Sequence, residues 1–157
     1  MGIGYDIHPF EPGRTLVLGG VKVEGSWGLR GHSDADALLH AIGDALLGAA
    51  GLGDLGDHFP DTDPRFRDVP SAVLLAEILV KVRVRGWVVG NVDATVVAER
   101  PRLAPYRQAM TARIASLLGI APEAVNVKAT THEGLGALGR GEGIAAMAVV
   151  LLVGAPA

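Results

Sequence analysis

Three residues of the sequence have the types and spacing of metal ligands: Asp6, His8 and His40. Asp6 and His8 stand two apart, and residues i and i+2 of a β-strand point to the same face. Two imidazoles and one carboxylate suit zinc, and three protein ligands leave the fourth tetrahedral position open to a substrate. Each residue taken alone is as well explained as a structural or surface group, so the prediction rests on the three together.

Further polar residues surround His40. The segment His32–His40 has a histidine at each end and two aspartates between them. Asp36, His40 and Asp44 recur every four residues, which places them on one face of a helix. A carboxylate next to a ligating histidine can fix its tautomer. The alternative is a solvated helix face, with Asp34 as the helix cap.

Three loops are candidates for substrate binding. Residues 51–68 form a long polar loop with five aspartates, which is either an ordinary surface loop or a flexible lid. In residues 128–133, hydroxyls and amides can hold phosphate oxygens, and Glu133 can bind Mg²⁺ or Mn²⁺. In the glycine-rich segment 139–143, Arg140 can pair with a phosphate or, in a structural turn, with Glu142. This segment lacks the spacing of a P-loop.

Composition excludes several classes of protein. The net charge of −3 comes without a basic face, which gives no basis for nucleic-acid binding. The longest apolar stretch, residues 144–153, is too short to cross a membrane. The chain has no cysteine, so thiolate metal sites and cysteine nucleophiles are excluded. The first residues lack a signal peptide's basic start and apolar core, so a cytoplasmic location is expected.

The elements that must position these residues are predicted from apolar periodicity within a single domain, residues 1–157. Strands are expected at 1–7, 15–18, 21–23, 87–98, 125–130 and 144–153, and helices at 34–50, 72–85 and 103–118. Asp34 and Ser71 are expected to cap the first two helices. The last strand is apolar on both faces, which predicts cover on both sides. This order predicts an α/β fold, an α+β sandwich with one sheet, helices packed on one face and a ferredoxin-like order.

Taken together, eight segments resemble the 2-C-methyl-D-erythritol 2,4-cyclodiphosphate synthase family over residues 2–153. The number, order and spacing of the segments carry the resemblance. They are Gly4–His8, His32–His40, Asp44–Ala50, Gly53–Gly56, Phe59–Pro64, Gly90–Asp93, Asn126–Thr131 and Gly139–Gly143.

The resemblance implies a reaction of the non-mevalonate isoprenoid pathway. The substrate would be 4-diphosphocytidyl-2-C-methyl-D-erythritol 2-phosphate, and the products a cyclic diphosphate and CMP. It also implies a homotrimer with active sites between subunits. Asp6, His8 and His40 would bind zinc, and Glu133 a second metal, Mg²⁺ or Mn²⁺.

The resemblance also assigns substrate-binding roles. His32, Ser33 and Thr131 would orient and stabilise the phosphates. The erythritol end would be held by Asp54, Leu55, Gly56, Phe59, Pro60, Asp61, Thr62 and Asp63. The cytidine pocket would be formed by the segment 98–104, with Ala98, Pro101, Arg102, Leu103 and Ala104, and by Thr130. His132 and Arg140 would be further substrate-binding residues.

Four positions depart from the family's usual pattern. Arg102 stands where lysine is common, which keeps the charge but changes its geometry. His132 stands where threonine is common, and Gly134 replaces a usual lysine. Ala137 replaces a usual phenylalanine near the expected trimer axis, so the sequence does not support a ligand in the axial cavity of relatives.

Two other functions remain open from the residues. One is a metal-dependent phosphohydrolase that uses the same zinc site with bound water. The other is a trimeric nucleotide-binding regulator, which would bind CDP without turnover.

Overall fold

The computed structural model describes residues 1–155, and its main feature is a five-stranded sheet. The strands follow the order β4-β1-β7-β5-β6, and β2 and β3 form a separate hairpin. The bounds are β1 Gly2–Pro12, β2 Leu16–Leu18, β3 Val21–Val23, β4 Trp27–Leu29, β5 Trp87–Val97, β6 Val125–Thr130 and β7 Gly143–Gly154.

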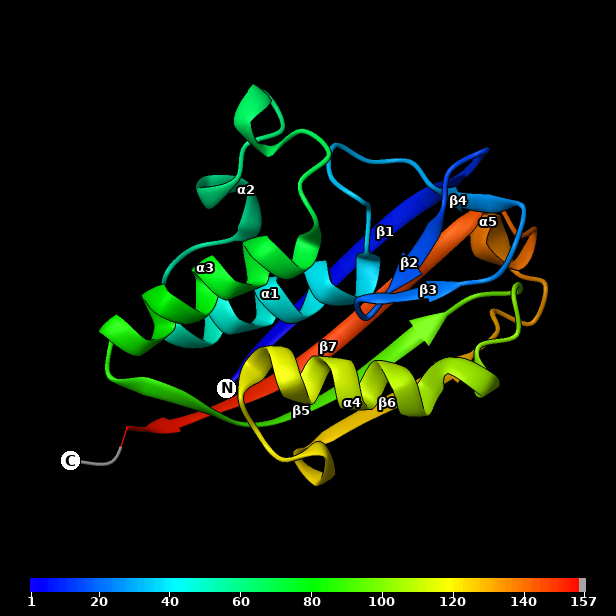
Figure 1. The fold of residues 1–157 in the computed structure, drawn as a ribbon. Coiled ribbons are helices and arrows are strands. Elements are labelled where there is room, and N and C mark those ends of the chain that lie inside the picture. The colour runs from blue at the N-terminus through cyan, green and yellow to red at the C-terminus, as the bar shows by residue number, and fades with distance from the viewer. Residues whose placement is uncertain (156–157) are drawn as a thin grey trace.

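Three long helices cover one face of the sheet, as Figure 1 shows. They are α1 Ala37–Ala50, α3 Ser71–Val84 and α4 Arg107–Leu118. The short helices are α2 Leu55–His58 and α5 Gly136–Gly139, and single 3-10 turns lie at Pro64–Phe66, Ala104–Tyr106 and Pro122–Ala124. The predicted α/β architecture with helices packed on one face of the main sheet is therefore confirmed, whereas the prediction of a single sheet was wrong, because β2 and β3 pair in a second, two-stranded sheet. Within residues 1–155, no helix has the length and apolar character needed to cross a membrane.

The ferredoxin-like order of strands is not confirmed. In that order a hairpin joins the middle two strands of the β-α-β-β-α-β pattern. Here α4 joins β5 to β6, and these two strands pair in parallel. A parallel pair requires such a crossover connection, so the helix and the strand direction agree with each other.

Small residues bring α1 close to β1 and so position the candidate metal ligands. A Cβ at Gly4 would overlap the Ala41 carbonyl and lie 2.7 Å from the Ala45 nitrogen. A Cβ at Gly2 would lie 2.6 Å from the Ala49 nitrogen. Glycine on the strand and alanine on the helix thus permit a near contact of the two backbones. His40, at the start of α1, comes within reach of Asp6 for this reason.

The local caps differ from those predicted. Asp36 caps α1 by accepting a hydrogen bond from the Leu39 amide, and it also accepts from Gly19 and Gly20. Ser71 is the first residue of α3, and no side chain caps that helix. Asp34 instead accepts hydrogen bonds from Ser71. The prediction was wrong because both aspartates satisfy the local pattern, and only the hairpin packed against α1 selects Asp36.

The other face of the sheet is open in a single chain. Alternate residues of β1 and β7 present large apolar side chains there, with Ile3 71% and Tyr5 54% exposed and four β7 residues 38–43% exposed. The four are Met147, Val149, Leu151 and Val153. On β5 and β6 the exposed side chains include Asp93, which pairs with Lys128 at 2.6 Å. The predicted cover on both sides of the last strand is thus absent from residues 1–155 of a single chain.

Candidate metal centre and substrate site

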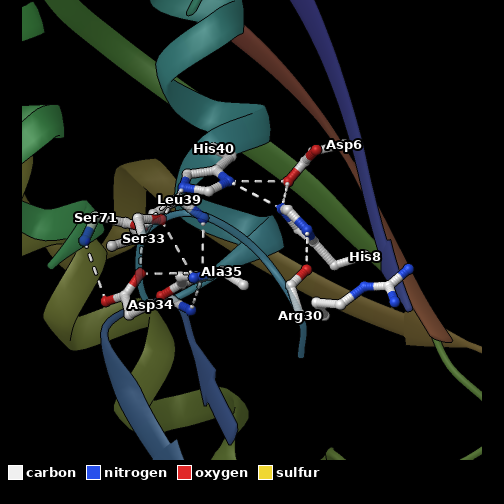
Figure 2. Close-up of polar contacts among 11 residues, drawn as sticks. Asp6, His8, Arg30, Ser33, Asp34, Ala35, Leu39, His40 and Ser71 are labelled. Atoms are coloured by element: carbon white, nitrogen blue, oxygen red, sulfur yellow. Dashed lines mark hydrogen bonds and ion pairs between the residues drawn. The ribbon is translucent and has the colours of Figure 1, made fainter. Parts of the chain in front are cut away.

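Asp6, His8 and His40 converge on one point, as Figure 2 shows. Asp6 Oδ2 lies 2.9 Å from His8 Nε2 and 3.0 Å from His40 Nδ1. The two nitrogens are 3.2 Å apart. Two ligands of a tetrahedral zinc ion with bonds near 2.0–2.1 Å stand about 3.3 Å apart. The three donor atoms therefore form a triangle that fits a small divalent cation after slight expansion.

The environment of the triad favours an ionised carboxylate. Burial alone would raise the pKa of Asp6, but hydrogen bonds from His40 and His8 outweigh it and hold that pKa well below the ordinary value. Burial alone would lower the pKa of His8, but its hydrogen bond to Asp6 outweighs this and raises that pKa. Asp6 is therefore ready to bind a cation at neutral pH, and the cation replaces the proton that His8 would otherwise hold.

Two cavities border the triad. One, of about 290 Å³, has His8 and His40 on its wall together with several predicted substrate residues. These are His32, Ser33, Leu55, Phe59 and Asp61. The other, of about 390 Å³, is lined by Asp6 and His40 and by the predicted erythritol-binding residues Asp54, Leu55 and Gly56. The structure thus brings most of the predicted erythritol-binding residues beside the predicted zinc ligands.

The remaining residues of the loop have other positions. Thr62 lines a neighbouring cavity with His32 and Arg14. Asp63 caps the 3-10 turn that follows and pairs with Arg65 at 2.7 Å. The Pro60 carbonyl accepts a hydrogen bond from the Asp63 amide. Pro60 and Asp63 therefore shape the loop in this structure.

The second group of predicted residues lies at the end of β6. The Thr131 hydroxyl donates to Glu133 Oε1 at 2.8 Å, and Glu133 has a φ of +50°. A positive φ is uncommon outside glycine and marks a turn that its surroundings must enforce. Glu99 supplies the enforcement, because its Oε1 accepts from the amides of His132 and Gly134 at 2.9 and 3.3 Å. All of Thr130–Glu133 is exposed.

The two groups do not meet within one chain. The strand register aligns Ile7 with Ala145, Ala145 with Val97, and Val97 with Thr130. Three strand spacings thus separate Asp6 and His8 from the end of β6, or about 14 Å. The groups lie at the same end of the strands but are separated across the sheet, one on β1 and the other after β6.

The predicted cytidine segment, residues 98–104, lies beside the end of β6. The Ala98 amide donates to the Thr130 carbonyl at 3.0 Å, and the side chain of Leu103 is buried. Pro101 lines a cavity of about 160 Å³ with Phe10 and Trp27. Arg102 and Ala104 are exposed. Arg140 donates to Glu142 at 2.6 Å, which is the structural pairing left open by the sequence.

Sequence reasoning missed four contributions to these sites. Ser71 and Asp34 lie behind His40, the Arg30 carbonyl accepts from His8 Nδ1 at 2.8 Å, and Glu99 supports Glu133. The two carboxylates predicted to flank His40 bond elsewhere: Asp36 accepts from backbone amides, and Asp44 accepts from the Leu55 amide. Apart from the Leu39 amide in the helix cap, the partners of these residues are 11–37 positions away in sequence, so no local motif could reveal them.

The fold and triad define a class: an α/β domain with a candidate metal site of two histidines and one carboxylate. Residues 1–153 match the YgbB family, and the chain belongs to it. The chain is 64% identical over 152 residues to the bifunctional enzyme IspD/IspF of Anaeromyxobacter dehalogenans (strain 2CP-C), covering 97% of this chain but 39% of that protein. This chain therefore spans about two-fifths of the length of that relative.

Single-function relatives match over nearly their full length. The 2-C-methyl-D-erythritol 2,4-cyclodiphosphate synthase of Bordetella avium (strain 197N) is 60% identical, with 97% of this chain and 94% of that protein covered. A solved structure of a 2C-methyl-D-erythritol-2,4-cyclodiphosphate synthase in a CDP-bound form has a TM-score of 0.89 and 39% identity, over 97% of this chain and 99% of that one. The family resemblance predicted from the motifs is confirmed.

Proposed function

We propose that this protein is a phosphorus-oxygen lyase of the non-mevalonate isoprenoid pathway. It converts 4-diphosphocytidyl-2-C-methyl-D-erythritol 2-phosphate into 2-C-methyl-D-erythritol 2,4-cyclodiphosphate and CMP. An oxygen of the 2-phosphate forms a bond to the β-phosphorus, and the bond from that phosphorus to the α-phosphate oxygen breaks. The electron pair leaves with CMP. The observation that carries the proposal is the Asp6–His8–His40 triad bordered by the predicted substrate residues.

Binding of cations follows from the donor sets. Asp6, His8 and His40 suit Zn²⁺, and three ligands leave a position for a phosphate oxygen. Glu133 is a single exposed carboxylate, as suits Mg²⁺ or Mn²⁺ that takes its other ligands from phosphates and water. When bound, these cations would neutralise the charge of the two phosphates as they approach.

The chain's own residues bind and orient the substrate. His32 and Ser33 lie on the cavity wall beside the triad, where they can donate to phosphate oxygens. Asp54–Gly56, Phe59 and Asp61 surround the same region and hold the erythritol end. Because the attack is intramolecular, positioning supplies much of the rate enhancement. No protein nucleophile is required.

The complete site forms between subunits of a homotrimer and binds a cytidine nucleotide as substrate. The enzyme acts in the cytoplasm. Two observations support the assembly. The end of β6, which Thr131 and Glu133 follow, lies about 14 Å from the triad in one chain, so a second copy must bring these residues to it. The open face of β1 and β7 carries exposed apolar side chains that another copy can cover.

Phosphorus NMR with 4-diphosphocytidyl-2-C-methyl-D-erythritol 2-phosphate and Mg²⁺, with and without a chelator, tests the reaction. The expected result is a cyclic diphosphate plus CMP that forms only without the chelator. CMP with a linear diphosphate would identify a phosphohydrolase instead. Binding of CDP without any turnover would identify a nucleotide-binding regulator.

Subunit mixing tests the assembly. A His40→Ala chain lacks the triad, and a Glu133→Gln chain lacks the second group. Random mixing of the two inactive chains would restore about one quarter of the sites, since each site takes one group from each of two copies. A mixture that stays inactive after subunit exchange, or a monomeric mass in light scattering, would contradict the intersubunit site.

A further inference from the structure

The nitrogen of His40 that faces away from the triad contacts two serines. Figure 2 shows His40 Nδ1 turned toward Asp6 and Nε2 turned toward Ser71 and Ser33. Nε2 lies 2.8 Å from Ser71 Oγ and 3.1 Å from Ser33 Oγ. Ser71 is fully buried at the start of α3, and Ser33 is 6% exposed. Both serines are thus shielded from water, and the shorter of the two contacts with His40 is that of Ser71.

Ser71 is held by a carboxylate. Its hydroxyl forms a short hydrogen bond with Asp34 Oδ1, and its amide donates to Asp34 Oδ2 at 3.1 Å. An ionised carboxylate only accepts hydrogen bonds, so the Ser71 hydroxyl proton must point to Asp34. The Ser71 oxygen is then left as an acceptor, and the nearer of the two groups that can donate to it is His40 Nε2 at 2.8 Å, with Ser33 Oγ at 3.5 Å.

The direction of these hydrogen bonds fixes the tautomer of His40. Because Ser71 Oγ accepts, a neutral His40 carries its proton on Nε2 and leaves the lone pair of Nδ1 free toward Asp6 and His8. His8 is fixed in the opposite tautomer, since the Arg30 carbonyl accepts from its Nδ1 and leaves Nε2 free. The two lone pairs converge only because the two histidines use different nitrogens.

We infer that Asp34 and Ser71 are positioning residues for the metal site, acting as a carboxylate–hydroxyl–imidazole relay on His40. The inference rests on the proposed metal site. With zinc bound, the relay would hold the one proton of the neutral imidazole on Nε2, so that Nδ1 faces the metal, and it holds the imidazole ring in place. Mutation of such a hydrogen-bonding partner of a metal ligand typically weakens metal affinity 10- to 100-fold.

Ser33 provides a matched control. It is the same residue type, is nearly as buried, and lies 3.1 Å from the same nitrogen. Its oxygen accepts from the Ala35 amide at 3.2 Å, but no carboxylate in the described chain holds its hydroxyl proton. Ser33 therefore cannot impose a hydrogen-bond direction on His40, although it borders the substrate cavity.

The test is zinc affinity by competition with a chromogenic chelator, measured for the wild type, Ser71→Ala and Ser33→Ala. We expect the zinc Kd of Ser71→Ala to rise about 10- to 100-fold and that of Ser33→Ala to change less than about threefold. A Ser71→Ala Kd within about twofold of the wild type would overturn the relay. Equal losses in both variants would overturn it too, because they would show a general packing effect.

A second measurement serves if Ser71→Ala does not fold. In ¹⁵N–¹H spectra of the zinc-bound wild type, the relay predicts a slowly exchanging proton on His40 Nε2. A proton that exchanges freely with water would overturn the relay. Neither measurement depends on the proposed reaction. If the wild type binds zinc but forms no cyclic product, the proposed reaction fails while the zinc affinities and the proton exchange still test the relay.

Discussion

The two groups of site residues differ in how completely one chain supports them. Asp6, His8 and His40 are half-buried, with side-chain exposures of 25%, 18% and 13%, and both histidines have hydrogen-bond partners on the nitrogen away from the centre. Thr131 and Glu133 are exposed and bond mainly to each other. Glu99 holds the turn that carries them, through the amides of His132 and Gly134.

This difference shows what each group requires from its surroundings. A cation site needs donor atoms fixed within tenths of an ångström, so the triad is enclosed by β1, α1 and the start of α3. A residue that meets its ligand across a subunit boundary must stay accessible until assembly. The enclosed group should therefore tolerate fewer changes than the exposed one, and the experiments below test that ranking.

Loss of a triad ligand is expected to have the largest effect. His40→Ala should lose zinc and lower turnover at least about 10³-fold while the fold survives. Metal analysis, circular dichroism and the phosphorus NMR assay measure the three properties. His58→Ala is the control, since His58 bonds to the Leu52 carbonyl and Lys81 away from the triad, and it should keep full zinc content. Full zinc content in His40→Ala would refute the site.

Loss of the exposed carboxylate should separate turnover from zinc binding. Glu133→Gln is expected to lower turnover about 10²-fold with an unchanged zinc content, because Glu133 is not one of the three residues of the triad. Titration of Mg²⁺ into the assay should show a weaker apparent affinity. A loss of zinc in this variant would contradict the expectation that the triad binds zinc without help from Glu133.

Loss of the support behind Glu133 should have a smaller effect. Glu99→Ala removes the acceptor of two amides in the turn and leaves the positive φ of Glu133 less constrained. A roughly 10-fold fall in turnover is expected, with zinc retained and partial recovery in Glu99→Gln, which keeps one acceptor oxygen. Thr131→Ala should likewise slow turnover and keep the metal. Wild-type kinetics in both alanine variants would remove this turn from the site.

The smallest effect concerns the triad without metal. The pKa of His8 is raised in the fold because its hydrogen bond to Asp6 outweighs burial. A raised pKa gives stabilisation that is complete below the unfolded value, 6.5, and is lost as pH rises through the folded pKa. Chelator-treated protein should therefore melt up to about 3 °C lower at pH 8.5 than at pH 6.

Two controls accompany the melting experiment. His8→Asn should remove this part of the pH dependence, because the group that titrates is gone. Added zinc should reverse the trend, since the metal requires a neutral imidazole and binds more tightly as pH rises. If wild type and His8→Asn show the same slope without metal, the Asp6–His8 interaction is not a source of stability.

The sequence by itself determined the candidate triad and the family. Asp6 and His8 are two apart on a strand, and His40 follows a helix start, so their types and local spacing were visible without a fold. The helices and most strands were also predictable from periodicity. Strand β1 runs on to Pro12, past the predicted end at residue 7, because β4 pairs with Phe10 and the two residues after it.

Only the tertiary structure decided which groups support these residues. Close packing of Gly4 against α1 brings His40 to Asp6, and the approach of α3 brings Ser71 to Asp34. The strand order places Thr131 and Glu133 away from the triad, although the resemblance assigns all of these residues to one site. Such contacts depend on how elements pack and in which order strands pair, and neither is encoded in the spacing of residues along one element.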